Sequence, residues 1–440
     1  MKTMNVRALA LDTLLRIEEE GAYSNVAIDE ALQRASFNDA DRRLFTTLVY
    51  GTLQYRETLD YYLEPFIQHR LERDVRMLLR LSIYQIVYLT RIPSHAVVHE
   101  AVTISKKRHS KRVGGVVNGI LRSFLREPLR SFDEIEDPIE RLAVETSHPV
   151  WLIRRWYYQY GLEEATNIAR MNNVPPPSTA RVNKMKTTPE QLAARLQEEG
   201  FDCEVSTTTD VSLRAMNGNF AQTEAFKEGL LSVQDESSML PVVALDPQRG
   251  ETILDVCAAP GGKTAFIAEK MHDEGTIYAH DIYAHKIDTI NEQAARLGIT
   301  SIQASIQDGR MLSERYESES FDRILIDAPC SGFGVIRRKP EIKYERDERD
   351  IQRLAHLQWQ IVEEAIPLLK KGGRLVYSTC TIDQLENDQI VQKIEKHYPQ
   401  MALIDSPLQQ LLETNERAVQ LFPHTIESDG FFIATFEKMK

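Results

Sequence analysis

The feature that most constrains this chain is a hydrophobic stretch, Thr252 to Val256, that runs directly into a turn of small residues. A helical pattern from Lys263 to Met271 follows the turn. Gly261 and Gly262 can adopt backbone angles that other residues avoid, and they let a ligand approach the main chain. The unpaired N–H groups at the start of a helix can then bind that ligand. This stretch predicts a strand, turn and helix of an open α/β sheet, in which ligands bind at the carboxyl ends of the strands.

Two later stretches have the same form, and each ends in a cysteine. Arg323 to Asp327 leads into Pro329-Cys330, and Gly373 to Tyr377 leads into Thr379-Cys380. A single cysteine at a strand end is more often a small buried hydrophobe than a nucleophile. Three such stretches in one half of the chain instead favour a pocket at one edge of a sheet.

Hydrophobic strands alternate with amphipathic helices from residue 230 onward, which predicts a mostly parallel, doubly wound sheet. The expected strands are 252–256, 276–281, 300–307, 321–327, 374–378 and 431–436, with 401–405 as a further candidate.

The three stretches together resemble the RNA cytosine-5 methyltransferases of the NOL/Nop2/Sun (fmu) family, which use S-adenosylmethionine. The resemblance covers nearly the whole chain and is greatest to the RsmB/Sun-type members. These members modify one cytidine of small-subunit ribosomal RNA, so the resemblance implies this RNA as partner and methylation of cytosine carbon 5 as the reaction. The family's sheet has seven strands, one of them antiparallel near the end.

The resemblance also implies a cofactor site. The family's contacts to S-adenosylmethionine correspond to the turn, the first helix residue and three aspartates at strand ends: Cys257, Ala258, Ala259, Pro260, Gly261, Gly262, Lys263, Asp281, Asp308 and Asp327. Asp281 lies 19 residues after Gly262, a spacing at which a carboxylate binds the ribose diol in dinucleotide folds. Asp308 is expected near the adenine. The alternative for each aspartate is a turn cap.

Cytosine carbon 5 is a poor nucleophile, and adding a thiolate to carbon 6 activates it by covalent catalysis. A positive environment promotes the thiolate, and Lys263 is a candidate source of that charge. Asp327 could hydrogen-bond the base edge. The residues alone leave open whether Cys330 or Cys380 attacks, because both end strands. The family resemblance assigns the attack to Cys380 and makes Cys330 the residue that assists product release. Arg337, Arg338, Lys339 and Lys343 follow Cys330 and are candidates for RNA phosphate contacts, with a solvated loop as the alternative.

Residues 1–130 show apolar residues at helical spacing and a basic balance, with 20 Lys+Arg against 15 Asp+Glu. The chain as a whole has a net charge of −12. Binding to a nucleic acid would therefore require a local patch of positive charge. The run from Lys106 to Arg112 is that patch, although a solvated helix end is the usual reading. Residues 82–88, 95–101 and 117–122 resemble the fold of the antitermination factor NusB, whose relatives bind RNA. His95 and His99 have a metal-binding spacing but no evident third ligand, and no metal is expected.

These observations divide the chain into a helical NusB-like domain (1–130), a linker with a small α+β subdomain (131–229) and a Rossmann-like methyltransferase domain (230–440). A βαβ unit is expected within the middle part. In the family that the chain resembles, a comparable subdomain helps form the RNA cleft, so the resemblance makes Arg181 and Asn183 candidates for that cleft. Only four cysteines occur, none close to another in sequence, which indicates a reducing cytoplasm. No apolar run approaches the roughly 20 residues of a membrane helix. A monomer without membrane association is expected.

Two other classes of protein stay open. Gly262-Lys263-Thr264 matches the end of a P-loop, and Asp327 could be the second aspartate of an NTPase, but Cys257 stands where that motif requires glycine. A non-catalytic, antitermination-type RNA-binding factor is the other alternative. A dinucleotide oxidoreductase is disfavoured because the Gly-x-Gly-x-x-Gly pattern is missing.

Overall fold

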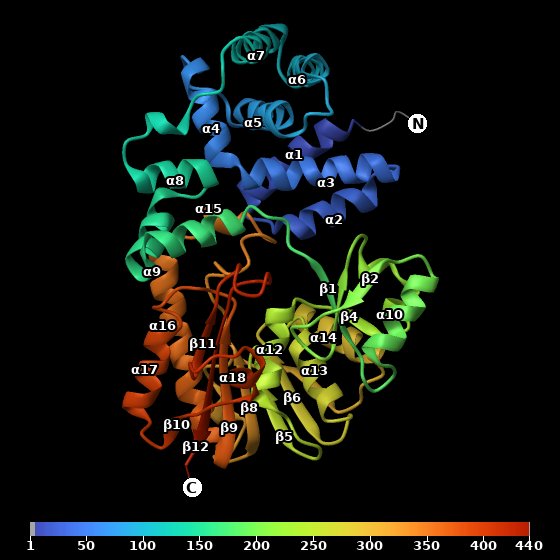
Figure 1. Ribbon diagram of the computed structural model, residues 1–440, viewed down its shortest axis with the longest axis vertical. Coiled ribbons are helices and arrows are strands. Elements are labelled where there is room, and N and C mark those ends of the chain that lie inside the picture. The colour runs from blue at the N-terminus through green and yellow to red at the C-terminus, as the bar shows by residue number, and fades with distance from the viewer. Residues whose placement is uncertain (1–4, 440) are drawn as a thin grey trace. The chain divides into compact units, whose positions relative to one another are not determined.

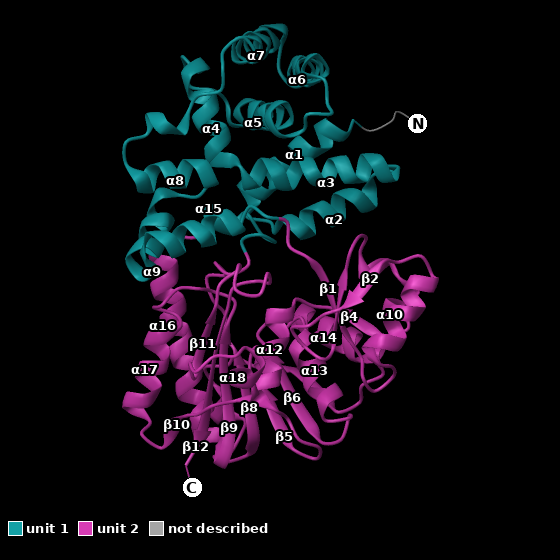
Figure 2. Cartoon of the chain, viewed as in Figure 1, with its two compact units in different colours: residues 1–174, 336–345 teal, residues 175–335, 346–440 magenta. Residues whose placement is uncertain are grey.

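The computed structural model describes residues 5–439, which form two compact units. The first unit contains the chain up to Val174 together with residues 336–345, and the second contains residues 175–335 and 346–440 (Figure 2). The chain therefore leaves the second unit once, for ten residues, and returns to it.

The first unit is helical (Figure 1). Its elements are α1 (Val6–Glu20), α2 (Ser24–Arg34), α3 (Asp39–Gln54), α4 (Arg56–Leu63), η1 (Glu64–Phe66), α5 (Arg73–Tyr88), α6 (Ser94–Arg108), α7 (Lys111–Phe124), η2 (Phe132–Glu134), α8 (Pro138–Thr146), α9 (Val150–Met171) and the short α15 (Ile342–Glu345). Side-chain caps start several of them: Asn5 accepts from the Ala8 N–H and Ser110 from the Val113 N–H. A single apolar core, which includes Leu14, Leu48 and Leu79, joins the helices of residues 6–124.

The second unit begins with a small four-stranded sheet in the order β2-β3-β1-β4. Its elements are β1 (Ser178–Val182), α10 (Pro189–Glu198), β2 (Cys203–Val205), β3 (Ser212–Ala215), η3 (Phe220–Gln222), α11 (Glu224–Lys227) and β4 (Leu231–Val233). The expected βαβ unit omits one strand of this sheet. β3 lies between β1 and β2 and pairs with both in antiparallel register. The sequence analysis did not predict the short strands β3 and β4.

The larger sheet has the order β10-β12-β9-β8-β5-β6-β7, and β11 pairs with β12. Its elements are α12 (Glu236–Leu245), β5 (Thr252–Asp255), α13 (Gly262–Lys270), β6 (Thr276–Asp281), α14 (Ala284–Leu297), β7 (Ile302–Ile306), η4 (Leu312–Glu314), β8 (Phe321–Asp327), α16 (Glu348–Ala365), η5 (Ile366–Leu368), β9 (Leu369–Thr379), α17 (Asp388–His397), β10 (Met401–Leu403), α18 (Pro407–Leu411), β11 (Ala418–Leu421) and β12 (Phe431–Lys438). Seven strands with β12 antiparallel to β9 match the expectation, and β11 is an additional eighth strand.

Helices cover both faces of this sheet, as the alternation of side chains along β8 requires. Leu325 packs in one core with residues of α12 and α13. Its neighbours Ile324 and Ile326 pack in the other core with residues of α16 and α17. Parallel strands buried on both faces explain why their sequences are almost continuously apolar. The fold class predicted from the sequence is confirmed. Within residues 5–439, no helix has the length and apolar character needed to cross a membrane.

Candidate active site

Four neighbouring strands of the large sheet, β9, β8, β5 and β6, end at the same edge. Asp255 at the end of β5 is in register with Leu325 of β8, and Asp327 at the end of β8 is in register with Ser378 of β9. Asp281 ends β6 on the other side of β5. The edge therefore brings together the side chains that the sequence placed at strand ends.

The turn after β5 is held by its own backbone. The Ala258 N–H donates to the His280 carbonyl at 2.8 Å, and the Gly261 N–H donates to the Ala258 carbonyl at 2.7 Å. The peptide bond between Ala259 and Pro260 is cis. Gly261 has φ +99°, and a Cβ there would lie 3.3 Å from the Ile290 Cα, so glycine is required at this position.

Asp255 is a buried carboxyl group beneath this turn. Its Oδ2 accepts a hydrogen bond from the Thr264 hydroxyl at 2.7 Å, while its buried Oδ1 has no partner among the described residues. Burial raises the pKa of Asp255 to about 7, against the lowering effect of the Thr264 hydrogen bond. An unpartnered buried acceptor beside a glycine turn is a feature that a bound ligand or water can satisfy.

Lys263, the second residue of α13, connects the turn to β8. Its Nζ lies 2.8 Å from Asp327 Oδ2 and 3.1 Å from the Ser238 hydroxyl. It also lies 4.9 Å from the centre of the Phe431 ring. Asp327 Oδ1 accepts from the Ser378 hydroxyl at 3.0 Å. The positive charge expected to promote a thiolate is therefore paired with Asp327.

Asp281 and Asp308 have different surroundings. Asp281 accepts from the Tyr283 N–H at 3.2 Å, and the exposed side chains of Ile282 and Tyr283 follow it. Asp308 forms an ion pair with Arg310 at 2.6 Å, and the hydrogen bond from Arg310 lowers the pKa of the carboxyl. Each of the two aspartates accepts a hydrogen bond from the backbone N–H two residues later, as a turn cap does. Their roles in cofactor binding stay predictions.

The two strand-end cysteines lie side by side. Cys330 Sγ and Cys380 Sγ are 3.3 Å apart, and both residues are partly exposed. The hydrogen bond with Cys380 is the main cause that raises the pKa of the Cys330 thiol well above its usual range, followed by burial. Glu386 and Asp327 add to this shift by charge. Cys330 therefore holds its proton beside the sulfur of Cys380.

A buried glutamate joins the two cysteine loops. Glu386 Oε1 accepts from the Ser331 N–H at 2.9 Å, and its Oε2 accepts from the Ser331 hydroxyl at 2.5 Å. The Ser331 hydroxyl also lies 2.7 Å from the Thr381 hydroxyl, and Gln358 donates to Glu386 at 3.0 Å. Burial raises the pKa of Glu386 to about 7. The sequence analysis missed this residue, for which the only signal was its position six residues after Cys380.

Cys257 is a third thiol at this edge of the sheet. Burial, followed by the charges of Asp255, Asp327 and Asp281, raises the pKa of the Cys257 thiol far above its ordinary value. A thiol of this kind stays protonated and is a poor nucleophile.

The expectation that Arg181 and Asn183 face an RNA cleft is wrong. Both side chains are fully buried. Arg181 forms a bidentate ion pair with Glu269 of α13 at 2.8 Å and donates to the Gly262 carbonyl at 2.9 Å. Asn183 donates to two backbone carbonyls, those of Gly229 and Leu297. These polar residues fix the small sheet to α13 and α14, and a sequence pattern cannot distinguish such a role from an exposed one.

The expected phosphate contacts after Cys330 are also wrong in part. Lys343 is fully buried and Arg337 is almost so. Lys343 donates to the carbonyls of Gln54 and Ser147, both at 2.7 Å. In contrast, the basic run on α6 and α7 is exposed at Lys106, Lys107, Arg108, Lys111 and Arg112.

A doubly wound sheet with β12 antiparallel, a glycine turn after the first strand and carboxylates at the strand ends defines the class of Rossmann-like methyltransferases. Residues 242–437 match the family described as 16S rRNA methyltransferase RsmB/F. Residues 4–126 match the NusB family, and residues 148–218 match the ferredoxin-like domain of RsmF/B-like methyltransferases.

Full-length relatives agree. The chain is 46% identical over 446 residues to the probable ribosomal RNA small subunit methyltransferase B of Bacillus subtilis, with 100% of both chains covered. It is 33% identical to ribosomal RNA small subunit methyltransferase B of Pectobacterium atrosepticum, with 99% of both covered. The crystal structure of PH0851 superposes with a TM-score of 0.84 at 26% identity over 99% of both chains. This chain belongs to the ribosomal RNA small subunit methyltransferase B family, as its resemblance predicted.

Proposed function

We propose that this chain uses S-adenosylmethionine to methylate carbon 5 of one cytidine in small-subunit ribosomal RNA through a covalent cysteine–cytosine adduct. The observation that carries the proposal is the pair of thiols at the ends of β8 and β9. Their sulfur atoms are 3.3 Å apart, and Asp327 ends the same strand that leads into Cys330. Two adjacent thiols, of which Cys330 holds its proton, suit a reaction in which one adds to the base and the other assists its departure.

The residues at the strand ends fit the cofactor. Asp255 Oδ1 is buried and has no partner among the described residues, and the glycine turn permits a close main-chain approach at the start of α13. The turn residues Cys257 to Lys263 would hold the cofactor through main-chain approach, and Asp281 would bind its ribose diol. Asp308 and Asp327 complete the proposed set. When bound, S-adenosylmethionine supplies an electrophilic methyl group carried on a sulfonium.

Cys380 is the proposed nucleophile. Its thiolate adds to carbon 6 of the cytosine, and the electron pair of the C5–C6 double bond makes carbon 5 nucleophilic. The Cys330 thiol can donate a hydrogen bond to the Cys380 sulfur across 3.3 Å and so stabilise the thiolate before the addition. Asp327 is held by Lys263 and Ser378 and can orient the base by accepting from its exocyclic amine.

Cys330 is the proposed release residue. After methylation, the carbon 5 proton passes to a water molecule, the C5–C6 double bond reforms and the bond between carbon 6 and Cys380 breaks. The proton on Cys330 stabilises the departing Cys380 thiolate. Because the negative charges of Glu386 and Asp327 help keep that proton on Cys330, the two thiols have distinct roles in this proposal.

A denaturing gel tests these assignments. Purified Cys330→Ala and Cys380→Ala proteins are each mixed with unmethylated small-subunit ribosomal RNA and S-adenosylmethionine, with the unaltered chain and a Cys203→Ala control beside them. Cys203 is buried in the small sheet, remote in sequence from both loops. We expect a denaturation-resistant RNA–protein adduct that accumulates with Cys330→Ala alone. An adduct that accumulates only with Cys380→Ala would reverse the two roles, and carbon 5 labelling of the product nucleoside checks the methylated position.

The helical unit is the proposed RNA-binding part. Its exposed basic run on α6 and α7 lies in the region that matches the NusB family, and exposed lysines and arginines bind phosphate with strong salt dependence. The P-loop alternative receives little support. Lys263 and Thr264 are engaged by Asp327 and Asp255, whereas a P-loop directs the same two side chains to nucleotide and magnesium.

A further inference from the structure

Two neighbouring residues, Glu386 and Asn387, bind the two cysteine loops separately. Both side chains are fully buried, and they lie between the end of β9 and the start of α17. Glu386 contacts the residue that follows Cys330, whereas Asn387 contacts the residues on either side of Cys380. Adjacent residues of one turn therefore hold two cysteines that are 50 residues apart in sequence.

The Cys330 loop is held at the residues before and after the cysteine. Both carboxylate oxygens of Glu386 accept from Ser331, one from its N–H and one from its hydroxyl. The side-chain amide of Gln358, on α16, donates to Glu386 and to the Pro329 carbonyl, both at 3.0 Å. The main chain on both sides of Cys330 thus has buried partners within the methyltransferase unit.

The Cys380 loop is held in the same manner by Asn387. Its Oδ1 accepts from the Thr379 hydroxyl at 2.6 Å, and its Nδ2 donates to the Thr381 carbonyl at 3.1 Å. The same Nδ2 also donates to the side chain of Gln420, on β11, at 3.0 Å. The Asn387 amide therefore uses its acceptor and both of its donors, which fixes its orientation.

The turn that carries these two residues is itself fixed. The N–H groups of Glu386 and Asn387 both donate to the Asp383 carbonyl at 3.1 Å. The buried Tyr377 hydroxyl, on β9, donates to the Glu386 carbonyl at 2.6 Å. Because breaking any of these buried contacts leaves a polar group without a partner, the turn resists a movement of either loop.

The two loops also meet directly. The hydroxyls of Ser331 and Thr381, the residues after the two cysteines, lie 2.7 Å apart, and the two sulfurs lie 3.3 Å apart. A hydrogen bond between thiols weakens steeply with distance and angle, and a displacement near 1 Å at a reacting group costs about a hundredfold in rate. The relative position of the sulfurs is therefore the quantity that the turn controls.

We propose that Glu386 and Asn387 are positioning residues, Glu386 for Cys330 in product release and Asn387 for Cys380 in the addition to carbon 6. This inference rests on the proposed cytosine chemistry. Each side chain acts through the residues beside the cysteine that it serves. Substitutions of two adjacent residues should therefore slow different steps of one reaction.

Glu386→Leu and Asn387→Leu test the proposal, because leucine fills a similar space without forming hydrogen bonds. Ser331→Ala and Thr379→Val are the milder second pair. Each removes one hydroxyl that binds the turn and leaves the turn residues unaltered.

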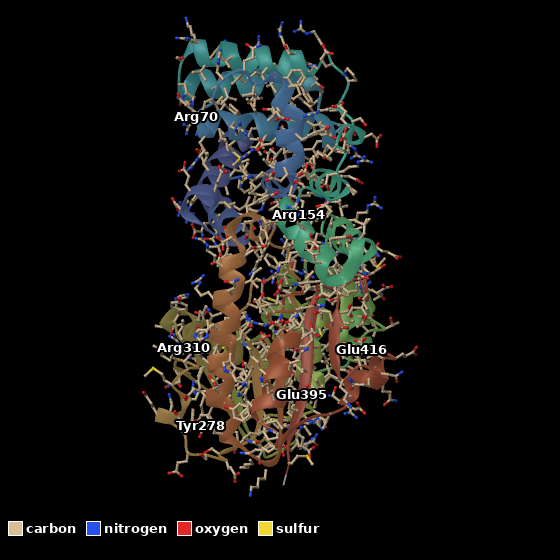
Figure 3. All side chains as sticks on the ribbon, turned by 90° about the vertical axis from the view of Figure 1, so that its left-hand side faces the viewer. Arg70, Arg154, Tyr278, Arg310, Glu395 and Glu416 are labelled. Atoms are coloured by element: carbon tan, nitrogen blue, oxygen red, sulfur yellow. The ribbon has the colours of Figure 1, made fainter. Side chains whose placement is uncertain are left out.

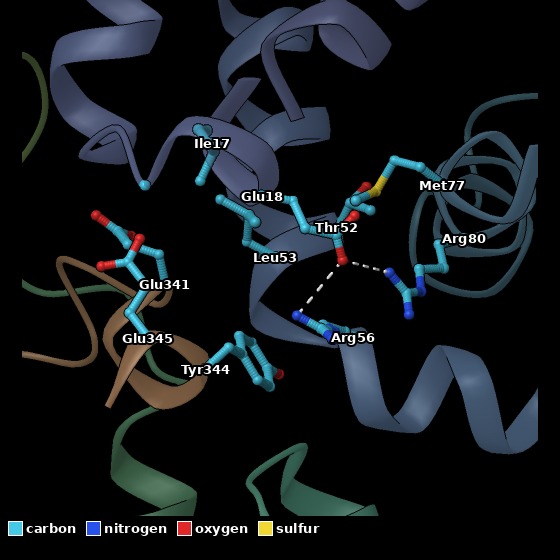
Figure 4. A pocket seen from close by; sticks show the side chains of 11 residues that line it. Ile17, Glu18, Thr52, Leu53, Arg56, Met77, Arg80, Glu341, Tyr344 and Glu345 are labelled. Atoms are coloured by element: carbon cyan, nitrogen blue, oxygen red, sulfur yellow. Dashed lines mark hydrogen bonds and ion pairs between the residues drawn. The ribbon is translucent and has the colours of Figure 1, made fainter. Parts of the chain in front are cut away.

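Two substitutions of the same kind at other buried positions are the controls. Asn183→Leu removes an amide that donates to the carbonyls of Gly229 and Leu297. Thr52→Val removes a hydroxyl at a pocket of about 90 Å³ in the helical unit (Figure 4), where it has no partner among the described residues. Both control residues are buried, so they measure the effect of losing a buried polar group away from the cysteine loops.

Full-length proteins are mixed with unmethylated small-subunit ribosomal RNA and S-adenosylmethionine. Adduct formation and adduct decay are timed separately by rapid quenching and denaturing gels, and urea denaturation measures the unfolding free energy. Each leucine variant is also made in the Cys330→Ala protein, in which the adduct is expected to accumulate because its release is blocked.

We expect Glu386→Leu to release the adduct roughly tenfold to a hundredfold more slowly, as a misplaced reacting group does. It should slow formation only about threefold, the cost of the weak thiol hydrogen bond to Cys380. In the Cys330→Ala protein it should change nothing further, because the thiol that it positions is gone. Asn387→Leu should slow formation roughly tenfold to a hundredfold in both backgrounds. Ser331→Ala and Thr379→Val should show the same two effects more weakly, and the controls neither.

Three results would overturn the proposal: equal slowing of both steps by Glu386→Leu, a further effect of Glu386→Leu in the Cys330→Ala protein, or unchanged formation in Asn387→Leu. If a leucine variant does not fold, the milder variant of the same loop decides by the same criterion. Absence of any adduct with Cys330→Ala alone would instead overturn the proposed function, so the two failures are distinguishable.

Discussion

Gly334 lies directly against Gly430. The Gly430 N–H donates to the Gly334 carbonyl at 2.8 Å, and a Cβ on Gly334 would come within 2.0 Å of the Gly430 carbonyl oxygen. It would also lie 2.8 Å from the Cys380 carbonyl oxygen. The loop after Cys330 is therefore packed backbone to backbone against the loops at the ends of β9 and β11, with no room for a side chain.

Gly334→Ala should consequently move the Cys330 loop. Because the clash is with main-chain atoms and no flexible side chain can yield, we expect methyl transfer to fall by about a hundredfold, the cost of a displacement near 1 Å at a reacting group. Cofactor affinity should change little. Single-turnover methylation and calorimetry measure the two quantities. Gly119→Ala on α7, where a Cβ meets nothing within 4 Å, is the control, and equal loss there would refute the packing argument.

The buried ion pair between Arg181 and Glu269 should matter for stability. Arg181→Met leaves the Glu269 carboxylate buried without its partner, and such a loss costs about 3–5 kcal/mol of unfolding free energy. The double substitution Arg181→Met and Glu269→Met should recover part of this loss, because no unpaired charge remains. Urea denaturation measures all three proteins. Arg195→Met serves as the control, since Arg195 pairs with Glu228 on the surface and should change stability little.

Glu386 predicts a pH dependence of stability. Its folded-state pKa of about 7 is raised from 4.5, so the folded protein binds more protons than the unfolded chain between these values. Glu386 therefore contributes most stability below pH 4.5, and this contribution falls as the pH rises toward 7. The fall amounts to about 3 kcal/mol for a shift of this size.

Glu386→Gln removes the titration but keeps an acceptor for the Ser331 N–H. The difference in unfolding free energy between this variant and the unaltered chain should change by about 3 kcal/mol between pH 4.5 and 7.5 and stay constant above. Chemical denaturation across this range measures it. Glu395→Gln, on the exposed side of α17 (Figure 3), is the control, and a parallel change there would mean that Glu386 is not the titrating group.

The exposed basic run predicts salt-dependent RNA binding. Neutralising Lys106 and Lys107 together should weaken binding and reduce the slope of log affinity against log salt by about 2 if each lysine meets one phosphate. Filter binding at several salt concentrations measures this slope. The control is the double substitution Lys370→Gln and Lys371→Gln, which removes the same charge at the beginning of β9. An equal effect of the control on the slope would mean that net charge alone is responsible.

The sequence predicted the parts of the site that lie at strand ends, because a strand and the turn after it are local in the chain. Asp281, Asp327, Cys330 and Cys380 were found in this way, and their strands end at one edge of the sheet. Asp255 lies at the same edge but was not singled out. Glu386 was missed because its burial depends on Ser331, 55 residues earlier. No periodicity encodes such a contact.

The predictions for two charged residues, Arg181 and Lys343, were wrong for a related reason. Arg181 was assigned to RNA from the family's subdomain and Lys343 from its position after Cys330, and both assignments required exposed side chains. Each is instead buried by partners remote in sequence, Glu269 for Arg181 and the carbonyls of Gln54 and Ser147 for Lys343. The domain limits expected at residues 130 and 229 stay predictions, and so do the roles assigned to individual cofactor-binding residues.

Residues 336–345 belong to the first unit although the chain on either side of them belongs to the second, and this affects any attempt to produce the two units as separate proteins. A protein that begins at Pro175 would keep residues 336–345 but lose Gln54 and Ser147, whose carbonyls accept from Lys343. The amine of Lys343 would then have neither of these two partners. The helices up to Val174, produced alone, would in turn lack α15. The two halves are thus complementary fragments rather than detachable modules, and we expect them to be soluble together and prone to aggregate apart.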